Sequence, residues 1–182
     1  MVRSVARLRV PAIAERTCSL TTRHCAKLDA KNYRSGSAML RQIYFGHLDM
    51  ELHHYFDPSG EESVADVKER VAKTSTVVAP LAEDRFLCAF GHIFSGSYSA
   101  GYYSYKWAEV LSADAFSLFE QNGIFDRKSG HAFLRHILEA GGSDDPMKLF
   151  VAFRGREPRI EPLLRHAGLE PSETVGHSCQ VS

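Results

Sequence analysis

A histidine and several tyrosines within residues 90–109 are the side chains of this sequence best suited to chemistry. The stretch reads F-G-H-I-F-S-G-S-Y-S-A-G-Y-Y-S-Y-K-W-A-E and holds one histidine, four tyrosines and the only tryptophan. Tyr98, Tyr102 and Tyr105 are spaced i, i+4 and i+7, so on a helix they would share one face, and His92 precedes them in a glycine-punctuated loop. Imidazole and phenol groups that face one groove can stabilise a developing oxyanion. We call these four side chains the donor wall; no nearby group is arranged to attack a substrate.

An aromatic stripe packed inside a helical core is the structural alternative to a site. Buried phenols need hydrogen-bond partners, so a purely structural core would more simply use phenylalanine. Gly91, Gly96 and Gly101 lie among the wall residues, and glycine allows a backbone to approach a ligand closely. These two features favour a site, and they predict that Gly96 and Gly101 contact substrate.

Other catalytic arrangements are absent from the sequence. It contains no H-E-x-x-H zinc motif, no G-x-S-x-G nucleophile turn and no glycine-rich phosphate loop. On a helix His47, Glu51 and His54 would share a face, which is either a metal spacing or a solvated polar face. The second interpretation is favoured, because a metal site also needs side chains that orient its ligands. Cys88 has apolar neighbours, which predicts a buried, unreactive thiol.

Helical periodicity runs through the sequence from about Leu28, and no segment alternates apolar and polar residues as a strand does. The predicted fold class is all-α. Helices are expected over about residues 39–56, 63–80, 99–121, 128–140, 147–153 and 160–167. The helix at 99–121 carries apolar side chains around much of its circumference, which predicts burial on most sides. Ser63 and Asp145 are placed to cap the helices that follow them.

The composition is that of a globular domain. Apolar residues make up 44% of the 182 positions and charged residues 24%. No apolar run approaches the roughly 20 residues of a membrane helix, so no membrane partner is expected. The four cysteines are scattered and form no C-x-x-C pair, which favours a reducing compartment.

Charge is unevenly distributed along the chain. Residues 1–27 hold six of the 22 basic groups and one of the 22 acidic groups, so the remainder carries a net charge of minus five. The folded part therefore gives no reason to expect nucleic-acid binding. The Arg-rich head is similar to an organellar transit peptide; the favoured alternative is a leader unrelated to the fold, such as a misassigned exon. Residues 170–182 form a polar tail.

The stretch G-H-I-F-S-G-S-Y-S-A-G-Y-Y-S-Y-K-W-A-E-V-L-S-A-D-A-F closely resembles the C-terminal catalytic region of the thimet oligopeptidase/oligopeptidase A family of zinc metallopeptidases. The flanking motifs agree: N-Y-R-S-G-S-A-M-L-R-Q before it, and G-G-S-D-D-P, G-R-E-P and L-L-R-H-A-G-L after it. The resemblance covers residues 28–169. The motif spacing is closer to oligopeptidase A and dipeptidyl carboxypeptidase than to animal thimet oligopeptidase.

The resemblance implies an all-α, two-lobed, neurolysin-like fold whose channel admits short peptides. It implies that Tyr105, and next Tyr98, donate to the tetrahedral oxyanion of peptide hydrolysis. His92 would line the site and Tyr102 would contact substrate. Ser97 stands where the family commonly has glycine. The family holds its zinc with the two histidines of H-E-x-x-H and a further glutamate, and this sequence has none of these upstream of the matched region.

We therefore expect residues 28–169 to be the C-terminal part of a zinc-dependent metalloendopeptidase that hydrolyses short peptides. The chain is expected to bind no zinc and to be inactive by itself, with the missing N-terminal part of the enzyme as its partner. The alternative is a non-catalytic peptide-binding or regulatory protein of the same fold. The expected location is the cytoplasm, or the mitochondrion or plastid if the head is a genuine transit peptide.

Overall fold

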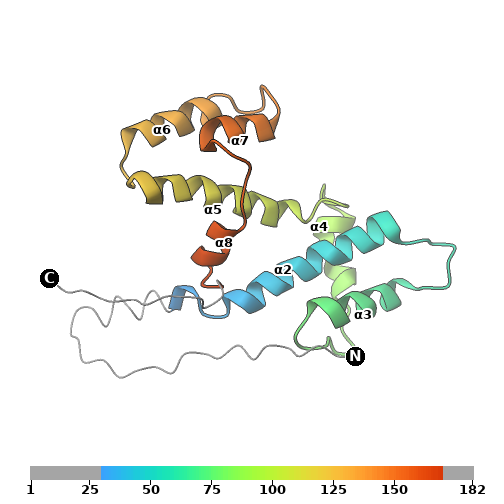
Figure 1. Cartoon of the computed structure of the whole chain (residues 1–182). Coiled ribbons are helices and arrows are strands. Elements are labelled where there is room, and N and C mark those ends of the chain that lie inside the picture. The colour runs from blue at the N-terminus through green and yellow to red at the C-terminus, as the bar shows by residue number, and fades with distance from the viewer. Residues whose placement is uncertain (1–29, 170–182) are drawn as a thin grey trace, which may run out of the picture. The chain divides into compact units, whose positions relative to one another are not determined.

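The computed structural model describes residues 30–169, and the predicted leader (1–27) and polar tail (170–182) lie outside them. The described residues from Arg34 onward belong to one compact unit, and every contact described below lies within it. The described residues form helices and connecting segments, with no strand among them (Figure 1). This confirms the all-α prediction.

Helix α2 (Ser35–Met50) continues directly into a π-helical turn, η1 (Glu51–Tyr55). Helix α3 (Val64–Ser75), a 3-10 turn η2 (Phe86–Ala89) and a short helix α4 (Gly91–Phe94) follow. The remaining elements are α5 (Ser104–Asn122), α6 (Arg127–Phe133) with its π-helical extension η3 (Leu134–Leu138), α7 (Pro146–Arg154) and α8 (Glu161–His166).

Side-chain caps begin two of the helices where the sequence predicts them. The Ser63 hydroxyl accepts the Asp66 N–H while the Asp66 carboxylate accepts the Ser63 N–H, a reciprocal capping box at the start of α3. The Asp145 carboxylate accepts N–H groups in the first turn of α7, where Pro146 has no N–H of its own to satisfy. Both findings confirm the predicted caps.

Two predicted helix boundaries are wrong. The long helix begins at Ser104 rather than near residue 99, because turns precede it in which Ala100 has a φ of 54°. Helix α3 ends at Ser75 rather than near residue 80; a run of β-branched residues follows, and Val78 is 79% exposed. Tyr98 and Tyr102 therefore lie outside the helix that was expected to present them.

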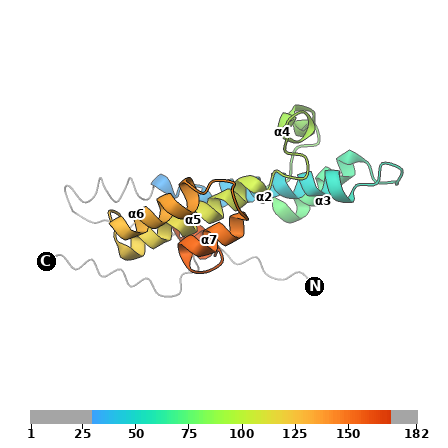
Figure 2. The same ribbon diagram turned by 90° about the horizontal axis from the view of Figure 1, so that it is seen from above.

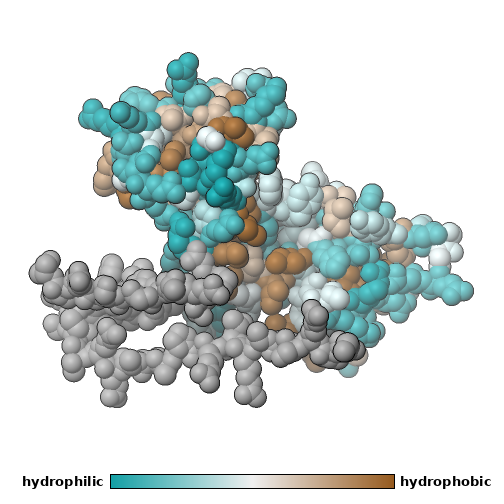
Figure 3. Space-filling view, viewed as in Figure 1, coloured by the Kyte–Doolittle hydropathy of each residue, from teal (hydrophilic) through white to brown (hydrophobic). Residues whose placement is uncertain are grey.

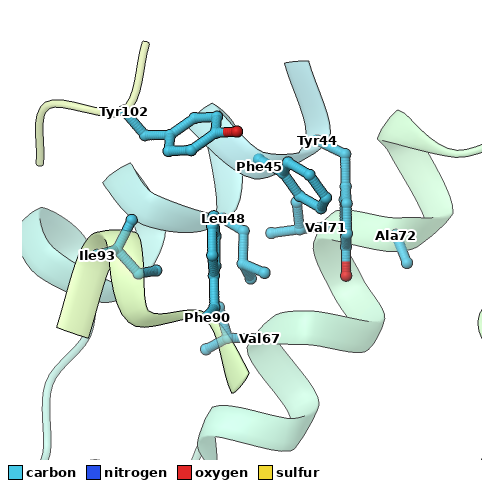
Figure 4. Packing of buried hydrophobic residues seen from close by; sticks show 9 residues of the cluster. All are labelled: Tyr44, Phe45, Leu48, Val67, Val71, Ala72, Phe90, Ile93 and Tyr102. Atoms are coloured by element: carbon cyan, nitrogen blue, oxygen red, sulfur yellow. The ribbon is translucent and has the colours of Figure 1, made fainter. Parts of the chain in front are cut away.

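The first hydrophobic core lies where α2 and α3 pack against η2 and α4 (Figure 4). Leu48 and Ile93 are fully buried in it. The Phe45 ring stacks on Phe86 with centroids 4.8 Å apart and meets Tyr102 edge-on at 5.8 Å. Aromatic burial on this scale packs residues 95–103, the connection between α4 and α5 that carries Tyr98 and Tyr102, against α2.

The second hydrophobic core is formed by α5, α6, η3 and α7, which lie beside one another in Figures 1 and 2. Phe150 and Phe153 of α7 are buried, and the Phe153 ring meets Phe133 edge-on at 5.4 Å. One further buried side chain beside this core is charged: Asp114 of α5 is fully buried. Its partners come from the end of α7 and the segment that follows it.

Apolar side chains also lie on the surface of the described part, as the brown areas of Figure 3 show. Trp107 and Phe116 of α5 are each 46% exposed. The prediction that this helix is buried on most sides is therefore wrong for residues 30–169, because α6, α7 and α8 cover only part of its circumference. Cys88 is exposed, which corrects the predicted buried thiol. No helix in the described ranges is long and apolar enough to cross a membrane.

Candidate functional site

The four side chains of the donor wall converge, although they come from different elements. His92 lies on α4 rather than in the predicted loop, Tyr98 and Tyr102 lie in the connection, and Tyr105 lies in the first turn of α5. The His92 ring centroid is 6.3 Å from that of Tyr98, 6.1 Å from Tyr102 and 6.5 Å from Tyr105. A folded connection, not one helix face, brings the predicted side chains together.

Tyr98 and Tyr105 are the wall's partly exposed phenols, at 37% and 38% exposure, with ring centroids 4.8 Å apart. The pKa of Tyr105 is raised to about 12, first by hydrogen bonding with Tyr98, then by desolvation and by repulsion from the neighbouring phenols. A raised pKa keeps the phenol protonated at neutral pH. The same holds for a phenol with the ordinary pKa of about 10, so the Tyr105 hydroxyl can act as a neutral hydrogen-bond donor.

Tyr102 occupies a different environment from these two tyrosines. Its side chain is 8% exposed, and it packs in the first hydrophobic core (Figure 4). Its hydroxyl donates to Gln42 Oε1 at 2.9 Å, and burial raises the pKa of Tyr102. Tyr102 is therefore the buried member of the donor wall, and its hydroxyl already has a partner within the protein. Its contact with substrate stays a prediction.

The packing around residue 96 requires a glycine at this position, for a reason that the sequence does not reveal. The Gly96 N–H donates to the Gly91 carbonyl at 2.7 Å, and a Cβ at this position would lie 2.7 Å from the His92 carbonyl oxygen. Only glycine fits this tight exit from α4 without a backbone shift. A Cβ on Gly101 would meet its nearest neighbour at an ordinary 3.6 Å. Substrate contacts of Gly96 and Gly101 stay predictions.

A residue that the sequence does not single out, Asp49, joins the wall to α2. Its carboxylate is fully buried and accepts the N–H groups of Ala100 and Tyr102, at 2.9 Å each. His53 of η1 lies with its Nδ1 2.8 Å from Asp49 Oδ1. The i, i+4 spacing of Asp49 and His53 next to Leu48 is a sequence signal for such a pair. The two amides lie 51 and 53 residues further on, so only the fold reveals them.

The side chains with metal-like spacing on α2 and η1, those of His47, Glu51 and His54, form a polar surface. His47 Nε2 lies 3.4 Å from Glu51 Oε1, and Glu51 also pairs with Arg70 at 3.0 Å. His54 lies against the ring of the residue that follows it. Within residues 30–169, no three His, Cys, Asp or Glu side chains are grouped so that they could hold one metal ion.

The chain is similar to several oligopeptidases. The family model described as peptidase family M3 matches residues 14–169, a match that begins inside the predicted leader. Organellar oligopeptidase A, chloroplastic/mitochondrial, of Arabidopsis thaliana is 56% identical over 78% of this chain and 18% of its own length. The probable cytosolic oligopeptidase A of the same plant is 55% identical over 78% of this chain and 21% of its own length. Oligopeptidase A of Escherichia coli is 48% identical, over 79% and 21% respectively. This chain spans about a fifth of the length of these relatives.

Proposed function

Because this chain belongs to peptidase family M3, we propose that its donor wall binds short peptides and donates hydrogen bonds to the tetrahedral oxyanion of peptide hydrolysis. Tyr105 is the first donor and Tyr98 the second, and His92 lines the same site. The 182 residues bind peptides but do not hydrolyse them by themselves.

One observation carries this proposal: the exposed Tyr98 and Tyr105 rings and the His92 ring lie together, within 6.5 Å of one another. The hydroxyl of Tyr105 is neutral at physiological pH, and hydrogen bonding with Tyr98 is the main cause that raises its pKa further, to about 12. Donors of this kind bind the charge of a transition state more strongly than a neutral peptide carbonyl. Loss of one such donor typically costs about 3 kcal/mol of the barrier.

The family relation implies zinc, but residues 30–169, which the structure describes, do not fit a zinc site. No group of three metal-binding side chains occurs within residues 30–169, and the sequence contains no H-E-x-x-H. We therefore assign no step to zinc. The contribution of these residues is to bind the peptide, to orient its carbonyl group and to donate hydrogen bonds to its oxygen.

A pair of ligands tests the donor role directly. The first is a fluorescein-labelled phosphinic pseudopeptide, whose tetrahedral anionic oxygen resembles the oxyanion; the second is the matching unmodified peptide. We expect Tyr105→Phe to weaken binding of the pseudopeptide about tenfold, the effect of one hydrogen bond to a charged group. Binding of the unmodified peptide should change less than twofold. Fluorescence anisotropy measures both dissociation constants.

Tyr103→Phe is the matched control, because Tyr103 is 56% exposed and is not part of the wall. If Tyr105→Phe weakened binding of both ligands equally, Tyr105 would not be an oxyanion donor.

A quenched fluorescent peptide incubated with the chain and Zn²⁺ tests the proposal that the chain does not hydrolyse peptides by itself. Phenanthroline-sensitive cleavage would overturn the statement that the chain is inactive alone.

We propose a location in the cytoplasm, or in the mitochondrion or plastid, since the relatives include a cytosolic and an organellar protein. Fluorescent fusions with and without residues 1–27 separate these compartments. Organellar import that depends on those residues would identify them as a transit peptide, and identical cytoplasmic fluorescence would identify them as a leader without that role.

A further inference from the structure

The Asp49 carboxylate of α2 contacts the connection between α4 and α5, residues 95–103. Its side chain is fully buried, and both of its oxygens accept backbone N–H groups from that connection: Oδ1 from Ala100 and Oδ2 from Tyr102. A buried carboxylate is tolerated only when such donors replace the lost hydration. These donors belong to two of the five residues, 99–103, that separate Tyr98 from the start of α5.

The connection held in this way is strained. Ala100 has a φ of 54°, a left-handed conformation that a residue with a Cβ rarely adopts. The bond from the Ala100 N–H to Asp49 Oδ1 favours this conformation over the relaxed ones. On the preceding side, the Ser99 hydroxyl donates to the Ile93 carbonyl at 2.6 Å and ties the connection to α4. A strained residue that its surroundings hold in place is typical of a functional site.

On the continuous α2–η1 helix that carries it, the partner of Asp49 is His53. The Nδ1 of His53 lies 2.8 Å from Asp49 Oδ1, and the His53 ring lies 5.6 Å from that of Phe94, at the end of α4. A carboxylate that is held by an imidazole on one side and by two amides on the other has one defined rotamer. Asp49 thus sets the path of the connection from a position outside the donor wall.

We propose that Asp49 is the positioning residue of the donor wall: by holding the Ala100 and Tyr102 amides, it places Tyr98 against Tyr105, so that both hydroxyls face one substrate atom. This inference rests on the proposed oxyanion role of the tyrosines. Asp49 itself touches no substrate, and it acts only through the backbone of the connection.

Asp49→Asn tests the proposal on the whole chain. An asparagine keeps the shape but replaces one acceptor oxygen with an NH₂ group, so one of the two amides loses its acceptor. The Tyr105 phenol, followed by ¹³C NMR of labelled tyrosines, should titrate closer to the ordinary pKa of about 10. Binding of the phosphinic pseudopeptide should weaken about fivefold, while binding of the unmodified peptide stays within about twofold, because the tyrosines and not the peptide contacts are displaced.

Two further variants separate positioning from stability. Asp114→Asn removes another fully buried carboxylate, at the second hydrophobic core, and should leave the Tyr105 titration unchanged even where it lowers stability. Ala100→Gly, added to Asp49→Asn, removes the strain, because glycine adopts positive φ freely. In this double variant, we expect the pKa of Tyr105 to return part of the way toward its wild-type value. The affinity for the pseudopeptide should recover in part as well.

His53→Gln is a milder substitution in the event that Asp49→Asn does not fold, and it should shift the Tyr105 titration in the same direction by a smaller amount. A folded Asp49→Asn chain with an unchanged Tyr105 titration and unchanged pseudopeptide affinity would overturn the inference. If the wild-type chain bound neither ligand, the proposed function would fail instead, and the Tyr105 titration would still decide whether Asp49 positions the tyrosines.

Discussion

Arg156 holds both carboxylate oxygens of Asp114 from a position 42 residues further along the chain. Its Nη1 and Nη2 atoms lie 2.6 Å from Oδ2 and Oδ1, respectively. The Arg159 N–H also donates to Oδ2 at 2.8 Å, and Arg154 Nε lies 3.3 Å from Oδ1. A bidentate pair with these additional donors satisfies a carboxylate that is fully buried. Asp114 thereby fastens the segment after α7 to the middle of α5.

Substitution of Arg156 should destabilise the fold strongly. Arg156→Leu leaves the buried Asp114 charge without its bidentate partner, and loss of one member of a buried pair lowers the free energy of unfolding by about 3 kcal/mol. Arg135→Leu, an exposed arginine of η3, is the control and should change this value by less than about 0.5 kcal/mol. Urea denaturation followed by circular dichroism measures both. Equal effects would show that the Asp114–Arg156 pair contributes nothing beyond surface charge.

Asp114 also predicts how stability falls in acid. Burial raises its pKa, but the hydrogen bonds from Arg156 and the Arg159 N–H outweigh that effect and lower the pKa to about 2 from the ordinary 3.8. A depressed folded-state pKa contributes stability that is present above the unfolded pKa and is lost as the pH falls toward 2. For Asp114 the loss is about 2 kcal/mol between pH 5 and pH 2.

Other carboxylates titrate in the same range, so the test is a difference between two chains. Unfolding free energies of the wild type and of Asp114→Asn, measured at pH 5 and pH 2, should converge by about 2 kcal/mol as the pH falls. A constant gap between the two chains across this range would refute the assignment of the lowered pKa to Asp114.

Two buried tyrosines should respond oppositely to loss of their hydroxyls. The Tyr44 hydroxyl is buried and has no hydrogen-bond partner among the described residues, and burial raises its pKa. Tyr44→Phe should therefore leave stability unchanged or raise it by up to about 1 kcal/mol. Tyr102→Phe removes a bond to Gln42 and should cost about 1 kcal/mol. Thermal or urea unfolding ranks the two variants, and a larger loss for Tyr44→Phe would reverse the expectation.

The coupling of Tyr98 and Tyr105 is measurable without any ligand. Tyr98→Phe removes the main cause of the raised Tyr105 pKa, so the Tyr105 midpoint should move from about 12 toward 10. Tyr103→Phe removes an exposed phenol outside the wall and should leave the midpoint in place. A ¹³C NMR titration of labelled tyrosines resolves the two cases. No shift in the Tyr98 variant would mean that the two hydroxyls act independently.

Local features of the structure could be predicted with good accuracy because their causes lie within a few residues. The Ser63 and Asp145 caps depend on amides two or three positions away, and both occur as predicted. The imidazole and phenol groups of the donor wall can likewise be read directly from the sequence. The helix start near residue 99 was wrong because Ala100 adopts a left-handed conformation, which nothing in its neighbours demands.

The sequence by itself determined the helical class and the family, and it predicted the four side chains of the donor wall. The tertiary structure decided which of these side chains are accessible: Tyr98 and Tyr105 are partly exposed, while Tyr102 is buried with its hydroxyl on Gln42. It also decided that Asp49 and Asp114 are buried, which an isolated helix pattern would place in solvent. The physical reason is one of distance along the chain, because the donors that make these burials tolerable lie 40 to 53 residues away and meet the carboxylates only after folding.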